Sequence, residues 1–89
     1  MKMEFNGKKL KALIVQKAMS TGKRNSEIRV DLIKFVGVTK QSLSYWEHGK
    51  FMPRMNQLMN LTKYFNLSTV TELIKNEVAK WLILNMTKV

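Results

Sequence analysis

The chain has 89 residues, with sixteen Lys and Arg against six Asp and Glu, and a formal net charge of +10. This length makes one small domain, residues 1–89, and the absence of cysteine excludes disulfides and thiolate metal sites. The single histidine, His48, excludes a multi-histidine metal site, so we expect no metal and no cofactor. So large an excess of positive charge is typical of proteins that bind a polyanion, although a merely basic surface is the alternative.

The positive charge is concentrated in the first part of the chain. Residues 1–54 hold twelve basic and four acidic side chains, net +8, whereas residues 55–89 hold four and two, net +2. No apolar run is long enough to cross a bilayer, and the first residues lack the apolar segment of a signal peptide. We therefore expect a cytoplasmic protein with no membrane partner.

Apolar residues recur at helical spacing along nearly the whole chain, which predicts an all-α fold of five helices and no strand. The first helix covers roughly residues 8–19, and its inward stripe is Leu10, Leu13, Ile14 and Ala18. A polar loop over residues 20–25 contains Lys23 and Arg24. The second helix covers roughly residues 27–35, with Ser26 as its N-cap and with Ile28, Leu32, Phe35 and Val36 buried. Gly37 ends it, because the turn there requires a positive φ.

A third helix begins after Thr39, which is expected to cap it. Val38 before the cap and Leu43 inside the helix form a hydrophobic staple, and Trp46 also faces inward. The segment 48–50 closes the helix, and Pro53 prevents its continuation. The outer face of this helix carries Lys40, Gln41, Ser44 and Tyr45.

Two more helices are predicted in the rest of the chain. The fourth covers roughly residues 55–65, with Leu58, Leu61 and Phe65 inward. Thr69 and Glu72 form a capping box for a fifth helix over residues 70–86. The apolar stripe of this last helix is Val70, Leu73, Ile74, Val78, Trp81 and Leu82.

The second and third helices, joined by a short turn with a glycine, have the pattern of a helix-turn-helix. In this motif the second helix presents its first residues to the major groove of DNA. Lysine donates to guanine and glutamine bonds to adenine, so Lys40 and Gln41 are candidate base contacts, with Ser44 and Tyr45 one turn further. The alternatives are an ordinary solvated helix face and, for Tyr45, packing over a neighbouring turn.

A second set of residues forms a recognisable sequence pattern across the same region. It comprises Leu32, Ile33, Val36, Gly37, Val38, Thr39, Leu43, Ser44, Trp46, Glu47, Gly49, Lys50, Pro53, Leu58, Leu61 and the segment 65–68. On this pattern, residues 28–73 resemble the lambda-repressor-like (Xre/Cro-type) helix-turn-helix family. The element Trp-Glu-x-Gly-Lys-x-x-Pro is its most specific part, and the resemblance covers about half of the chain.

The resemblance implies phosphate contacts around the reading helix and a structural role for Glu47. Arg29 would contact phosphate from the start of the second helix, which in this family lies across the DNA backbone and braces the third. The alternative is that Arg29 only pairs with Asp31 or Glu27 on the surface. His48, Lys50 and Arg54 would fall in the loop that grips the backbone. Apart from the resemblance, Thr39 and Ser42 at the start of the third helix are candidate phosphate contacts, as are Lys23 and Arg24 in the loop over residues 20–25. Glu47 would pair with a basic residue of the first helix, Lys11 or Lys17.

The sequence departs from the family pattern in three places. Ile33 stands where a small residue is usual, which implies wider helix spacing or repacking. The connection between the first and second helices is about six to eight residues longer than usual in the family. The fifth helix continues past the family's usual end.

The C-terminal segment is more apolar than the core of one small domain requires. Its apolar side chains are Trp81, Leu82, Ile83, Leu84 and Met86. Core burial accounts for Trp81 and Leu82, whereas the others point in different directions. We expect these residues to form a homodimer interface, which would place two reading helices on a palindromic site.

The sequence therefore predicts a homodimeric, sequence-specific double-stranded DNA-binding protein that acts as a transcriptional repressor. It is not expected to be an enzyme, because its carboxylates are scattered and no nucleophile lies beside a base. Two alternatives remain. One is an antitoxin or inhibitor whose main role is to bind a protein partner through the fifth helix, and the other is a nucleic-acid binder that uses charge alone.

Overall fold

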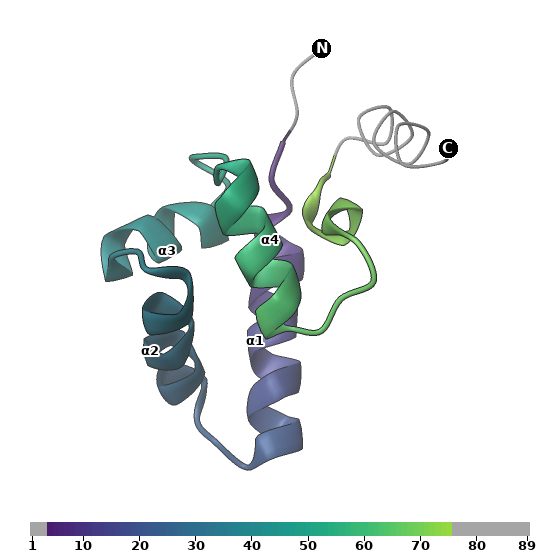
Figure 1. The fold of residues 1–89 in the computed structure, drawn as a ribbon. Coiled ribbons are helices and arrows are strands. Elements are labelled where there is room, and N and C mark those ends of the chain that lie inside the picture. Colours follow the sequence, from purple (N-terminus) through teal and green to yellow (C-terminus); the bar gives the residue numbers. More distant parts are fainter. Residues whose placement is uncertain (1–3, 76–89) are drawn as a thin grey trace.

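In the computed structural model, residues 4–75 are described, and they form four α-helices and one short 3-10 helix (Figure 1). In chain order these are α1 (Gly7–Thr21), α2 (Asn25–Val36), α3 (Lys40–Glu47), α4 (Met55–Tyr64) and the 3-10 helix η1 (Val70–Leu73). The described part of the chain has no strand, only an isolated antiparallel bridge between Phe5 and Ile74. This confirms the all-α prediction for residues 4–75. No helix in that range has both the length and the apolarity to cross a membrane.

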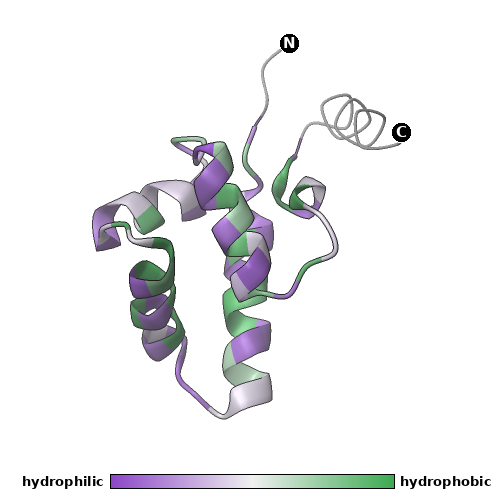
Figure 2. Ribbon diagram, in the orientation of Figure 1, coloured by the Kyte–Doolittle hydropathy of each residue, from purple (hydrophilic) through white to green (hydrophobic). Residues whose placement is uncertain are grey.

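The core lies where α1 meets α2 and α3, with α4 and η1 closing it (Figure 1). The apolar faces of the helices turn towards one another, and their polar faces turn outwards (Figure 2). The predicted inward residues that the structure buries are Leu10, Leu13, Ile14, Ala18, Ile28, Leu32, Leu43, Trp46, Leu58, Leu61, Leu73 and Ile74.

The connection between α1 and α2 is shorter than predicted, because it spans only residues 22–24. Ser20 and Thr21 belong to α1, and their hydroxyl groups donate to the carbonyl oxygen of Lys17. Gly22 then ends α1 in the left-handed conformation, at φ 72°. The extra length that the sequence suggested for this loop is therefore largely helical.

Two predictions about α2 are wrong. Its N-cap is Arg24 rather than Ser26, and the Glu27 carboxylate accepts from the backbone N–H of Arg24. Phe35 is 51% exposed rather than buried. It lies near the end of α2 and packs one side of its ring against Tyr64 of α4, with the ring centroids 5.4 Å apart. Burial is the main cause of a raised pKa at Tyr64, and the nearby charge of Asp31 adds to it.

The turn between α2 and α3 has the predicted local structure. Gly37 has a φ of 79°, and its N–H donates to the carbonyl oxygen of Ile33 at 2.9 Å. The hydroxyl of Thr39 accepts from the N–H of Ser42 at 3.1 Å, which caps α3. The left-handed glycine reverses the chain and the threonine starts the next helix, so both local predictions are confirmed.

The predicted fifth α-helix does not begin at residue 70. Residues 70–73 form η1, and Glu72 accepts from the N–H of Ser68, so the capping box with Thr69 is not formed. The chain then runs extended beside its own beginning. Asn6 N–H donates to Leu73 and Lys75 N–H donates to Glu4, each at 2.8 Å. This pairing requires extended backbone, which an α-helix started at Thr69 could not supply. The predicted part of that helix over residues 76–86 lies outside the described residues.

Gly7 allows α1 and α3 to approach closely. A Cβ atom at residue 7 would lie 2.6 Å from the carbonyl oxygen of Trp46 and closer still to that of Glu47. The first turn of α1 therefore packs directly on the last turn of α3. A side chain larger than hydrogen at residue 7 would separate the two helices.

Candidate nucleic-acid interface

The inner face of α3 is fixed in the core. Leu43 is 1% exposed and Trp46 is 4% exposed, and the ring of Phe5 lies 6.4 Å from that of Trp46. These contacts set the rotation of α3 about its own axis. Its opposite face is therefore held towards solvent.

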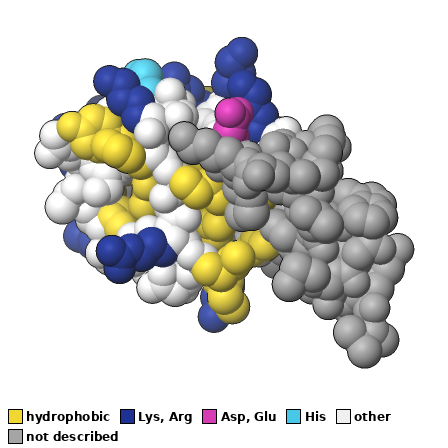
Figure 3. All heavy atoms as spheres, turned by 90° about the horizontal axis from the view of Figure 1, so that it is seen from above, with side chains coloured by type: hydrophobic (Ala, Val, Ile, Leu, Met, Phe, Trp, Pro, Cys, Tyr) yellow, Lys and Arg dark blue, Asp and Glu magenta, His cyan; other side chains and the backbone are white. Residues whose placement is uncertain are grey.

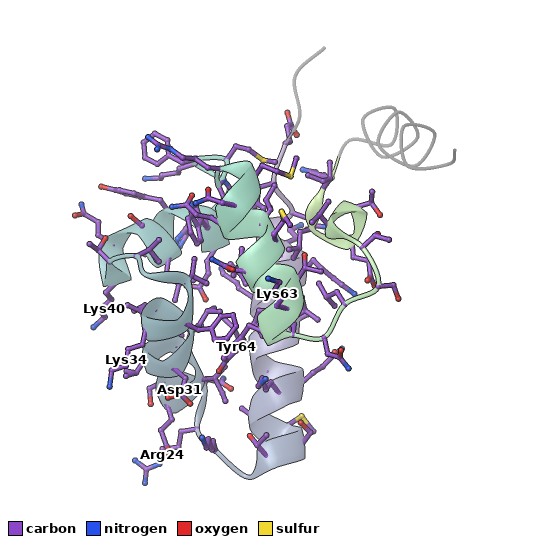
Figure 4. The ribbon with its side chains drawn as sticks, in the orientation of Figure 1. Arg24, Asp31, Lys34, Lys40, Lys63 and Tyr64 are labelled. Carbon is purple, nitrogen blue, oxygen red and sulfur yellow. The ribbon has the colours of Figure 1, made fainter. Side chains whose placement is uncertain are left out.

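The outer face of α3 carries the four side chains predicted to contact bases. Lys40, Gln41 and Ser44 are exposed, and Lys40 projects away from the body of the molecule at the first turn (Figure 4). The side-chain amide of Gln41 donates a 2.6 Å hydrogen bond to the hydroxyl of Tyr45, one turn further along. The structure thus brings Gln41 and Tyr45 together on one exposed strip.

Tyr45 is half-buried because its ring also packs against the connection between α3 and α4. The ring of Phe51 meets it edge-on with the centroids 5.1 Å apart, and the Lys50 ammonium lies 5.9 Å from its centre. The predicted alternative for Tyr45, packing over a neighbouring segment, is therefore present, and the base contact stays a prediction. The ring packs over a neighbouring segment, while the hydroxyl stays on the outer face beside Gln41.

An ion pair joins α2 to α3. Nη2 and Nε of Arg29 lie 2.9 and 3.0 Å from Oε1 of Glu47, whose side chain is only 8% exposed. The predicted partner of Glu47 from the first helix is therefore wrong. Lys17 instead donates to the carbonyl oxygen of Tyr64 at 2.7 Å and lies 4.0 Å from the centre of its ring. Arg29 is nearer because the second turn of α2 lies beside the last turn of α3.

Ile33, in place of the usual small residue, predicts a wider spacing of α2 and α3 or a repacking between them. The structure leaves a depression of about 400 Å³ between the two helices, and Ile33 lines it together with Val30 and Leu43. The Arg29–Glu47 pair lies in the same depression. The two helices are therefore held by the ion pair at one end and by the turn at residues 37–39 at the other.

Several predicted phosphate contacts lie at the two ends of α3. Thr39 and Ser42 cluster at its start, where their hydroxyl groups are 3.1 Å apart. His48 follows its last residue, and its ring Nδ1 lies 2.7 Å from the carbonyl oxygen of Ser44. Lys50 and Arg54 are exposed in the connection to α4.

The predicted phosphate contacts Lys23 and Arg24 lie apart from the others. Arg24 and Lys40 occupy opposite ends of one edge of the molecule (Figure 4). The Lys23 ammonium lies 3.3 Å from the carboxylate of Asp31, an exposed ion pair. The structure therefore does not bring this loop together with the first turn of α3.

Three basic residues that are not among the predicted phosphate contacts lie near the end of α3. Lys8 and Lys11 of α1 and Lys75 after η1 line a depression of about 330 Å³ together with His48. Basic side chains flank the histidine along one edge of the face in Figure 3. Lys75 reaches this depression through the pairing of the two ends of the described chain, and Lys8 and Lys11 reach it through the packing of α1 on α3.

The predicted dimer-interface residues Trp81, Leu82, Ile83, Leu84 and Met86 lie outside the described residues.

The chain matches no protein-family model, and comparisons with curated proteins and with solved structures find no significant similarity. Any functional proposal must therefore come from the geometry and chemistry of α2, α3 and their surroundings.

Proposed function

We propose that the protein binds double-stranded DNA by sequence, with α3 in the major groove and α2 across the backbone. The observation that carries the proposal is the placement of Lys40 and Gln41. They are exposed at the first turn of a capped helix whose inner face is fixed by Leu43 and Trp46. A reading helix needs this combination of rigid mounting and exposed polar side chains at its start.

The outer face of α3, which carries Lys40, Gln41, Ser44 and Tyr45 and is called the outer strip below, has suitable hydrogen-bonding groups for base edges. The Gln41 amide carries two N–H groups, and one donates to Tyr45 at 2.6 Å. The other N–H and the amide oxygen match N7 and the N6 amino group of adenine. Lys40 can donate to O6 and N7 of guanine. This strip can therefore distinguish base pairs.

The surrounding residues suit the DNA backbone. Thr39 and Ser42 at the start of α3, and His48, Lys50 and Arg54 beyond its end, would contact phosphates on either side of the groove. Arg29, engaged by Glu47 at 2.9 Å, supports α3 and retains a 37% exposed side chain from which to meet phosphate. Lys23 and Arg24 would add contacts only if the DNA reaches the far end of α2.

The resemblance to the lambda-repressor-like family remains part of this proposal. The short glycine turn, the threonine cap and the packing of Leu43 and Trp46 support it. So does the position of Pro53 after α3. On this assignment the protein is a cytoplasmic transcriptional repressor that binds a palindromic operator as a homodimer.

The homodimer is proposed to form through Trp81, Leu82, Ile83, Leu84 and Met86. Sedimentation of the full chain and of a chain ending at Lys80 tests this assignment. The full chain should sediment as a dimer and the shortened chain as a monomer. An unchanged oligomeric state would remove the C-terminal segment from the interface.

A second candidate function is protein binding, as an antitoxin or inhibitor. The observation that favours it is the exposure of large apolar side chains in the connection after α3 and on α4. Phe51, Met55 and Met59 are 60%, 52% and 50% exposed. Large exposed apolar surfaces often mark protein interfaces. This candidate requires no preference among DNA sequences.

Selection of bound duplexes from a random pool distinguishes the two candidates. A sequence-specific homodimer should recover a palindromic motif, with half-sites about one helical turn apart. A protein-binding module or a binder that uses charge alone should recover no motif. Failure to enrich any sequence would contradict the proposed function.

A further inference from the structure

Three segments of the chain meet at the C-terminal end of α3 and form a cleft lined by lysines. One depression of about 330 Å³ is lined by Lys8, Lys11 and Glu47, and an adjoining one of about 320 Å³ by Glu4 and Lys50. Both are also lined by Phe5, His48, Gly49 and Lys75. We call the two together the basic cleft.

The backbone around the basic cleft is held in place by specific contacts. The N–H of Lys75 donates to the carbonyl oxygen of Glu4 at 2.8 Å, beside the bridge between Phe5 and Ile74. Gly7 packs against the carbonyl groups at the end of α3, which fixes the first turn of α1. The backbone positions of Lys8 and Lys75 are therefore fixed relative to the end of α3.

The charge in the basic cleft is unbalanced. Among the described residues, its lining includes four lysines and His48 but two carboxylates. One of these, Glu47, is engaged by Arg29 at 2.9 Å and is 8% exposed, so it neutralises little of the lysine charge. The other, Glu4, is exposed. This excess of ammonium groups over carboxylates within residues 4–75 favours a polyanionic ligand.

We propose that the basic cleft binds the phosphodiester backbone of DNA at the side of the groove that α3 enters. This inference rests on the proposed function, because it uses the same placement of α3. The rise of 1.5 Å per residue puts the end of α3 about 10 Å from Lys40. The major groove is about 12 Å wide, so with Lys40 at the bases the end of α3 meets a flanking strand.

The basic cleft would contribute affinity without sequence preference. Lysine ammonium groups act on phosphates as point charges, and each phosphate that they neutralise releases counterions from the DNA. The observed binding constant then falls with salt by a slope of about 0.9 per phosphate neutralised, on logarithmic axes. The contribution of Lys8, Lys11 and Lys75 is therefore measurable as a salt slope.

Two double variants with equal loss of charge provide the test. Lys8→Gln with Lys11→Gln removes two lysines of the basic cleft. Lys9→Gln with Lys63→Gln removes two lysines that do not line it. Lys9 is the best match, because it lies in the same turn of α1 as Lys8 but points about 100° away around the helix. Circular dichroism and thermal unfolding verify that each variant is folded.

DNA binding of the full chain is then measured against salt, on a selected duplex and on a random one. The cleft variant should reduce the salt slope by about 1.8 on both duplexes, since about 0.9 is lost per phosphate contact. The control variant should leave the slope close to that of the wild type. Equal slopes for the two variants would overturn the inference.

These measurements distinguish a failure of this inference from a failure of the proposed function. If the wild type prefers no sequence, the proposed function fails, while the slope comparison on random DNA still tests the cleft. Vesicles with anionic headgroups provide a second probe. If the cleft variant loses binding to vesicles but keeps the wild-type slope on DNA, the cleft is not a DNA site and the inference is wrong.

Discussion

Arg29 and Glu47 join α2 and α3 through a pair of contacts, in which Nη2 and Nε of the guanidinium lie 2.9 and 3.0 Å from one carboxylate oxygen. The carboxylate side chain is 8% exposed and the arginine side chain 37% exposed. The pair is the only ion pair between helices α2 and α3 within residues 4–75. It therefore links the orientation of α3 to the helix proposed to brace it.

Arg29→Met should destabilise the protein by about 1–3 kcal/mol, because it leaves the largely buried Glu47 carboxylate without its partner. Lys34→Met is the control, since Lys34 is an exposed residue of the same helix. It should change stability by less than about 0.5 kcal/mol. Urea unfolding of both variants measures the difference. Equal effects of the two substitutions would show that the ion pair adds nothing to stability.

Tyr45→Phe tests whether the tyrosine hydroxyl positions Gln41. The substitution removes the 2.6 Å hydrogen bond and keeps the ring contact with Phe51. Affinity for a selected duplex should fall about fivefold, equivalent to about 1 kcal/mol for one hydrogen bond. Affinity for random DNA should not change. An equal loss on both duplexes would mean that Tyr45 acts on the backbone or on folding instead.

Gly7→Ala should destabilise the protein by about 1–3 kcal/mol, because the new methyl group would overlap the carbonyl groups of Trp46 and Glu47. Without that overlap, alanine would be favoured over glycine in a helix. Gly22→Ala is a useful comparison. It meets no atom within 4 Å and is disfavoured only by its φ of 72°. Its cost should be about 1 kcal/mol.

DNA binding separates these two glycine variants further. Gly7→Ala should also weaken binding, since it displaces α3 relative to α1. Gly22→Ala, at the far end of α1, should bind DNA as the wild type does. Wild-type stability of Gly7→Ala would contradict the close packing of the two helices.

Thr39→Ala should destabilise the protein by about 1 kcal/mol, because the N–H of Ser42 loses the hydroxyl that accepts from it at 3.1 Å. Thr39→Ser keeps that acceptor and should remain within about 0.5 kcal/mol of the wild type. Thermal unfolding compares the three proteins. If Thr39→Ser lost as much stability as Thr39→Ala, the cap would not be the cause.

Local signals predicted much of the fold and of the outer strip. The spacing of Leu10, Leu13 and Ile14 places α1, and Gly37 with Thr39 defines the turn into α3. These features depend on residues a few positions apart, so the sequence contains them directly. The exposure of Lys40 and Gln41 follows from the burial of the opposite face.

Contacts between distant segments could not be predicted in the same way. The helical spacing after Thr69 suggested a fifth α-helix there, but residues 70–73 form η1, and the chain from Ile74 is extended beside residues 4–6. Glu47 has several basic residues within reach of a plausible fold, and only the packing of α2 on α3 selects Arg29. Lys50 of the basic cleft was predicted as a phosphate contact, but Lys75 joins it only through the same pairing of distant segments, and Lys8 and Lys11 only through the packing of α1 on α3.

Recognition of bases by α3 is proposed to depend on Gln41. The most direct test is competition between a selected duplex and random DNA, for the wild type, Gln41→Ala and Lys50→Ala. The wild type should prefer the selected duplex by roughly 10³-fold or more. Gln41→Ala should lose about 1–3 kcal/mol at one base position, whereas Lys50→Ala should weaken all duplexes alike. Equal competition by random DNA, with no effect of Gln41→Ala, would contradict sequence recognition by α3.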